Sequence, residues 1–133
     1  MKRTTRVLTW LSPVAMLLAT AVTAVTPATA QTRMPLQTID FPAGYQTVAV
    51  IAELEPGQCT ARHAHPGIES AYVLEGEAVA KFDGKPDLPL GAGKPLHFGP
   101  EEMHVVCNTG TGRFKAIAHY VVRKDKPLVL RAP

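Results

Sequence analysis

The chain has 133 residues, of which 46% are hydrophobic and 19% charged, a composition typical of one globular domain. Its formal net charge is +3, but Lys2, Arg3 and Arg6 lie ahead of a long uncharged stretch. Without these three, the other 11 of the 14 Lys and Arg residues balance the 11 Asp and Glu residues, which all follow residue 31. A neutral domain lacks the basic surface that nucleic acid or an anionic membrane requires, so both partners are excluded.

The first 30 residues have the pattern of a Sec-type signal peptide. The charged start leads into an apolar stretch from Val7 to Val25, and Ala28 and Ala30 form the small-residue pattern that signal peptidase recognises. We therefore predict cleavage between Ala30 and Gln31 and a periplasmic or secreted protein without a membrane anchor. A transmembrane span is the alternative, but the stretch is rich in Ala and Thr and ends at a cleavage site.

The remaining residues predict an all-β fold, with an N-terminal arm over residues 31–45 and a β-barrel domain over residues 46–133. Short runs of β-branched and aromatic residues are separated by Gly and Pro, and no helical apolar stripe exceeds two turns. The Asp83-Gly84 pair predicts a hairpin that leads into the region of Leu88. This pattern is typical of a sandwich or barrel. The predicted strands are Thr47–Leu54, Cys59–Ala64, Glu69–Glu75, Glu77–Phe82, Pro95–Phe98, His104–Thr109 and Arg113–Val122.

Three histidines and one glutamate form a candidate metal site. His63 and His65 are separated by one residue, so on a strand both side chains point to the same face. The Pro66-Gly67 turn can then bring Glu69 back toward the two imidazoles, and His104 begins a later predicted strand. Three imidazoles and one carboxylate suit a divalent ion such as Mn, Fe, Co, Ni, Cu or Zn. Four protein ligands leave open positions on an octahedral metal, which a catalytic site requires.

At these residues the chain resembles the cupin family. The first cupin motif is matched at every position by Gly57-x5-His63-x-His65-x3-Glu69-x6-Gly76. The second is matched in part by His104-x3-Asn108, with Pro100 four residues before the histidine. The family's usual glycine three residues before this histidine is Glu101 here, and its usual proline two residues further back is Gly99. This departure concerns the shape of the turn that leads to the histidine more than the ligand itself.

The resemblance implies a small single-domain cupin, similar to quercetin dioxygenase and folded as a double-stranded β-helix, or jelly-roll barrel. It implies that His63, His65, Glu69 and His104 bind one divalent metal ion inside the barrel. Outside the cytoplasm's control of metal supply, Zn or Cu fits this site as well as Fe or Mn, and Ni is a further candidate. Small cupins commonly dimerise, so the resemblance also includes a homodimer among the expected partners.

The function that follows is a metal-dependent enzyme acting on a small organic molecule. Dioxygenase-like chemistry is one form, and a non-redox lyase or isomerase is another. The alternative is a non-catalytic periplasmic protein that binds a metal or a small ligand, since fold does not decide function. Four ligands without a fifth favour the enzyme.

Two residues are candidates for acid–base catalysis. Glu69 can act in this way as well as ligate the metal. His119 alternates with Ile117 and Val121, so it points either into the barrel, as a proton carrier, or out of it. We interpret His97 as an ordinary strand or loop residue and Asn108 as a structural amide. The predicted core aromatic and methionine residues are Tyr72, Phe82, Phe98, Met103, Phe114 and Tyr120.

Cys59 and Cys107 are the only two cysteines, and both belong to the part predicted to be exported. An even count in an oxidising compartment is compatible with a disulfide bond. In the family's fold the strands that carry them pair around the metal, which would place them nearly opposite each other. Strand parity argues against the bond, because Cys59 shares the face of His63 whereas Cys107 lies opposite the face of His104. A bulge would be needed, and two buried free thiols are the alternative.

Overall fold

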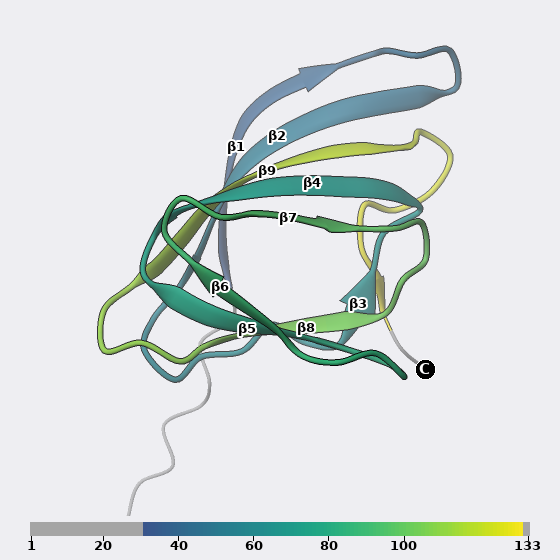
Figure 1. The fold of residues 1–133 in the computed structure, drawn as a ribbon. Helices are drawn as coiled ribbons and strands as arrows, with labels where there is room; N and C mark the ends of the chain where they lie inside the picture. Colours follow the sequence, from purple (N-terminus) through teal and green to yellow (C-terminus); the bar gives the residue numbers. More distant parts are fainter. Residues whose placement is uncertain (1–30, 132–133) are drawn as a thin grey trace, which may run out of the picture.

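The computed structural model describes residues 31–131, so the predicted signal peptide lies outside the described residues. This part of the chain folds into two five-stranded antiparallel sheets that face each other (Figure 1). The first sheet has the order β1-β2-β9-β4-β7, and the second has the order β10-β3-β8-β5-β6. The strands are β1 (Thr32–Ile39), β2 (Tyr45–Leu54), β3 (His63–Ala64), β4 (Gly67–Glu75), β5 (Glu77–Phe82), β6 (Leu88–Gly91), β7 (Pro95–Phe98), β8 (His104–Asn108), β9 (Phe114–Arg123) and β10 (Leu130–Arg131).

The described residues contain strands and turns but no helix, which confirms the predicted all-β class. Accordingly, no described segment is a helix of the length and apolarity that crossing a bilayer needs.

The core lies between the two sheets and follows the period of two that strands impose. Along β9, every second side chain from Phe114 to Val122 is buried, and the intervening side chains are more exposed. The same alternation runs along β4, where Val73 is fully buried. Burial of a valine side chain of this kind contributes about 1.5–3 kcal/mol to stability.

Most predicted strands are present, and two coincide with the observed bounds, Glu77–Phe82 (β5) and Pro95–Phe98 (β7). The predicted hairpin is confirmed, because β5 pairs with β6 beyond the Asp83-Gly84 turn. The strand expected over Cys59–Ala64 is wrong in extent. Only its last two residues form β3, since the chain bends at Arg62.

The expected N-terminal arm is instead a strand of the first sheet. Strand β1 runs antiparallel to β2, with a register shift between Pro35 and Gln37. The sequence did not indicate a strand because β1 is an edge strand, where a proline and polar residues are tolerated and alternation is weak. This pairing places Arg33 opposite Ala52 of β2, and the arginine is half-buried.

The turn before β8 requires a left-handed residue at the position where the cupin motif has glycine. Glu101 adopts a φ of +57° there, a conformation that glycine favours. Its backbone N–H donates a 2.8 Å hydrogen bond to the carbonyl oxygen of His65. The glutamate therefore adopts this conformation at a cost that glycine would avoid.

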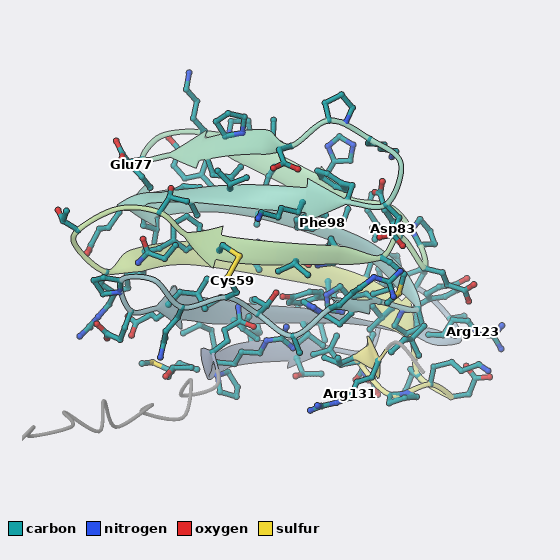
Figure 2. All side chains as sticks on the ribbon, turned by 90° about the horizontal axis from the view of Figure 1, so that it is seen from below. Cys59, Glu77, Asp83, Phe98, Arg123 and Arg131 are labelled. Atoms are coloured by element: carbon teal, nitrogen blue, oxygen red, sulfur yellow. A yellow bond between two sulfur atoms is a disulfide. The ribbon has the colours of Figure 1, made fainter. Side chains whose placement is uncertain are left out.

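Cys59 and Cys107 form a disulfide bond, with their Cα atoms 4.0 Å apart (Figure 2). The parity argument against this bond was wrong, and so was the alternative of two free thiols. His63 pairs with His104, and Cys59 pairs with Cys107, so four residues on one segment match three on the other. The bend at Arg62 absorbs the extra residue, as a β-bulge does.

We predict that the double substitution Cys59→Ser and Cys107→Ser lowers the free energy of unfolding by up to about 4 kcal/mol, because the bond closes a long loop. The two cysteines are separated by 48 residues in sequence. Urea unfolding of both proteins measures the difference, and a two-dalton mass increase on reduction verifies the bond in the parent. Equal unfolding free energies would contradict the prediction.

A second prediction concerns the turn. Glu101→Gly should raise the free energy of unfolding by about 0.5 kcal/mol or more, because glycine adopts a positive φ without the clash of a Cβ atom. The matched control is Glu77→Gly, an exposed strand glutamate without a positive φ, which should lower stability by about 0.5–1 kcal/mol. If both variants were destabilised equally, the strain argument would be refuted.

Candidate metal centre

The three predicted histidine ligands meet inside the barrel, and Glu69 lies beside two of them. His63 in β3 and His104 in β8 are register partners in the second sheet, and His65 follows β3 directly. Glu69 in β4 approaches them from the first sheet, where it is paired with Tyr120 of β9. All four predicted ligands are buried, with exposed fractions of 4%, 1%, 7% and 2% for His63, His65, Glu69 and His104.

Each of the three imidazoles is anchored by its Nδ1 atom to a backbone carbonyl oxygen. A carbonyl oxygen only accepts hydrogen bonds, so each Nδ1 must carry the proton and donate it. Each Nε2 atom then carries the lone pair of the ring, which is the form that ligates a metal. The bonds join His63 to Ala61 at 2.8 Å, His65 to Leu128 at 2.7 Å and His104 to Glu102 at 2.9 Å.

The three histidines form a close cluster, with Glu69 next to His65 and His104. One ring nitrogen from each histidine lies within 4.8 Å of the others. Glu69 Oε2 lies 3.0 Å from His65 Nε2 and 3.8 Å from His104 Nε2. The Nε2 atom of His65 is fully buried and has no hydrogen-bond partner among the described residues. A buried lone pair facing a carboxylate is costly unless a cation lies between them, so this donor set fits a divalent metal ion.

Burial sets the protonation states that a metal would need. It lowers the pKa of His63 to about 4, although the carbonyl of Ala61 acts in the other direction, and the nearby Arg33 guanidinium adds a smaller lowering effect. Burial also lowers the pKa of His104, although the carbonyl of Glu102 and the carboxylate of Glu69 act in the other direction. These two imidazoles are therefore neutral at neutral pH.

Glu69 carries the negative charge of the site. Burial alone would raise the pKa of this carboxyl group, but the rings of His65 and His104 and the hydroxyl of Tyr120 outweigh burial. Its pKa lies below the usual value as a result, so Glu69 is a carboxylate at neutral pH. Neutral imidazoles and an ionised carboxylate are the forms in which these groups bind metals.

Two aromatic residues hold the ligands in place. Phe98 of β7 stacks on His104, with ring centroids 3.7 Å apart and planes inclined by 8°. The hydroxyl of Tyr120 donates a 3.0 Å hydrogen bond to Glu69 Oε1, and the Tyr120 ring lies 4.6 Å from that of His65. We expected both aromatics in the core, where they are, but the sequence pattern did not reveal their contacts with the ligands. The contact between Tyr120 and Glu69 could have been inferred from the pairing of their strands, because both side chains point inward.

Arg33 is a site residue that sequence reasoning missed. Its Nη2 atom donates a 3.1 Å hydrogen bond to Nε2 of His63, and its Nε atom donates a 3.0 Å bond to Oε1 of Gln31. No motif indicated this residue, because it lies in the segment predicted to be an arm.

The structure does not bring His119 to the site. It is exposed on the outer face of β9, between the buried residues Ala118 and Tyr120. The inward orientation that would have made it a proton carrier is therefore wrong. Tyr120, the next residue along β9, points inward, so His119 points outward. His97 is likewise exposed, on the outer face of β7, as expected for an ordinary strand residue.

Asn108 is a structural amide, as predicted. Its side-chain nitrogen donates to the carbonyl oxygens of Leu54 and Gly112, and its side-chain oxygen accepts from Gly110 N–H, each at 2.9 Å. Among the predicted core aromatics, Tyr72 is the exception, since it is exposed on the outer face of β4.

Comparison with known proteins supports the fold. A double-stranded β-helix domain of Klebsiella pneumoniae has a TM-score of 0.64 at 22% identity, covering 81% of this chain and 90% of that one. The DMSP lyase DddQ of Ruegeria pomeroyi has a TM-score of 0.65 at 20% identity, and the match covers 85% of this chain and 58% of the DddQ chain. The polyketide cyclase RemF of Streptomyces resistomycificus has a TM-score of 0.63 at 19% identity, and the match covers 84% of this chain and 78% of the RemF chain. No curated protein sequence matches the chain.

These identities show a shared fold and not a shared activity. The sequence itself matches the cupin domain family over residues 50–120, which is more than half of the chain and includes all four predicted ligands. The jelly-roll fold, the match and the positions of the histidines agree, and the chain belongs to the cupin family.

Proposed function

We propose that this protein is an exported metal-dependent cupin enzyme that acts on a small organic molecule. One divalent transition metal ion, Fe, Mn, Ni, Cu or Zn, is bound by His63, His65, Glu69 and His104. The proposal depends on one observation: three imidazoles, each anchored through Nδ1, bring one ring nitrogen each to within 4.8 Å of the others beside a carboxylate. Four protein ligands leave positions on a six-coordinate metal for a substrate.

When bound, the metal would supply a Lewis acid that polarises a carbonyl group or stabilises an enolate. Tyr120 orients Glu69 by donating to Oε1, which leaves Oε2 directed at the histidines. Burial raises the pKa of Tyr120 and the neighbouring carboxylate raises it further, so the phenol stays protonated and remains a donor.

Export is supported by two independent features. The first 30 residues have the signal-peptide pattern described above. The disulfide bond between Cys59 and Cys107 is of the kind that persists outside the reducing cytoplasm.

The direct test is the metal content of the protein, produced from the full-length chain with its own leader. We expect close to one metal ion per chain by mass spectrometry, and loss of that ion in His63→Ala. The matched control is His119→Ala, which removes an exposed imidazole from the outer face and should keep the metal. Fe, Mn, Ni or Cu would direct the activity search to dioxygenase-like chemistry, and Zn to lyase and isomerase chemistry. A folded parent protein without metal would refute the proposal.

The role of Tyr120 gives a further prediction. Tyr120→Phe removes the hydrogen bond to Glu69 Oε1 and should weaken Zn²⁺ binding about 10-fold or more, the usual effect of losing a group that orients a ligand. Competition with a chelating dye measures the affinity. Tyr72→Phe, at an exposed position on the outer face, is the control and should leave the affinity unchanged. Equal affinities in the parent and Tyr120→Phe would remove Tyr120 from the site.

A further inference from the structure

Arg33 is distinguished from the other described arginines by where its charge lies. Arg62, Arg113, Arg123 and Arg131 are exposed to solvent, and the first three each pair with at least one carboxylate. Arg33 is half-buried on the inner side of the first sheet, and no carboxylate pairs with it in the described part of the chain. A partly desolvated cation without an anionic partner is unfavourable and indicates that an anion is missing.

The contacts of Arg33 place its charge at the metal centre. Gln31 holds the guanidinium through Nε, and Nη2 is directed at Nε2 of His63, the atom expected to ligate the metal. A metal ion on this nitrogen would use the lone pair that now accepts the hydrogen bond. The guanidinium and the metal would then be two neighbouring cations, an arrangement that is stable only with an anion between them.

The charges at the site lead to the same conclusion. Glu69 provides one negative charge, which is less than the sum of a divalent ion and the Arg33 guanidinium. Other nearby acids are engaged elsewhere, because Glu102 pairs with Lys85, and Glu53 pairs with Arg113 and Lys115. The described residues therefore leave an excess of positive charge, which an anionic ligand would reduce.

We propose that Arg33 is a substrate-binding residue and that the substrate is a small carboxylate whose anionic group lies between Arg33 and the metal. This inference rests on the proposed function and specifies its substrate class. A guanidinium presents parallel N–H donors that match the two oxygens of a carboxylate, and Nη1 has no hydrogen bond to the described residues. Carboxylate oxygens also bind the open positions of divalent transition metal ions.

The test uses Co²⁺ as a spectroscopic probe and two small ligands of equal size, acetate and acetamide. The protein produced from the full-length chain is loaded with Co²⁺, and each ligand is titrated while the visible cobalt absorption is recorded. Arg33→Gln removes the charge, Arg33→Lys keeps it, and Lys94→Gln is the control because it removes an exposed charge that has no ion pair among the described residues. Cobalt stoichiometry and circular dichroism verify that each variant is folded and loaded.

We expect Arg33→Gln to weaken acetate binding about 10- to 100-fold, the effect of losing a hydrogen bond between charged groups. Arg33→Lys should restore part of the affinity, Lys94→Gln should match the parent, and acetamide should bind equally to all four proteins. Acetate affinity that is unchanged in the cobalt-loaded Arg33→Gln variant overturns this inference and leaves the metal site standing. A parent protein that takes up no cobalt overturns the proposed function and this inference together.

Discussion

The hydrogen bonds between the three Nδ1 atoms and backbone carbonyl oxygens are the constraint on which the site depends. Each bond fixes one ring in both tautomer and direction, and the carbonyl groups come from three different segments of the chain. Ala61 lies beside β3, Glu102 lies in the turn before β8, and Leu128 lies just before β10. The convergence of the Nε2 atoms therefore requires the whole second sheet and the ends of its strands to be in place.

That requirement explains the dense bonding around the very short strand β3. The two residues of β3 form too few backbone hydrogen bonds to hold His63 rigidly against β8. The segment before β3 therefore forms additional bonds to β8. The backbone N–H of Thr60 donates to the carbonyl oxygen of Val106 at 2.8 Å, its hydroxyl accepts from Val106 N–H at 3.0 Å, and Cys59 is covalently tied to Cys107. The disulfide bond on the outer surface thus stabilises the same strand pair whose inner face carries two of the imidazoles.

The sequence predicted the parts of this structure that depend on local pattern. The β-branched runs indicated most strands, and the spacing of His63, His65 and Glu69 indicated that these side chains share the inner face, because both depend on which way successive side chains point. It failed where the outcome depends on partners distant in the chain. Strand β1 forms only because β2 offers it an edge, so no alternation in its sequence indicated the strand, and Arg33 was missed with it.

The disulfide bond shows the same limit. Strand parity is valid only along a regular strand, and the bend at Arg62 interrupts the strand between Cys59 and His63. A one-residue irregularity reverses the face of every residue beyond it, so the parity argument failed there. The orientation of His119 was open for a related reason, since alternation alone does not indicate which of two faces is inside. The burial of Tyr120 against Glu69 decides it.

The two sheets contribute chemically different groups to the centre. The segment around β3 and strand β8 supply imidazoles, and the first sheet supplies a carboxylate from β4, a phenol from β9 and a guanidinium from β1. In Figure 1 these sheets form the opposite walls of the barrel, so the charged and proton-bearing groups face the imidazoles across its interior. In the proposed site the imidazoles and the Glu69 carboxylate would hold the metal ion. The carboxylate and the guanidinium would set the net charge around that ion, and the neutral phenol would orient the carboxylate. Since β1 is an edge strand that pairs with β2 alone and adds no residue to the buried hydrophobic core, Arg33 reaches the centre from the edge of the first sheet without a role in that core.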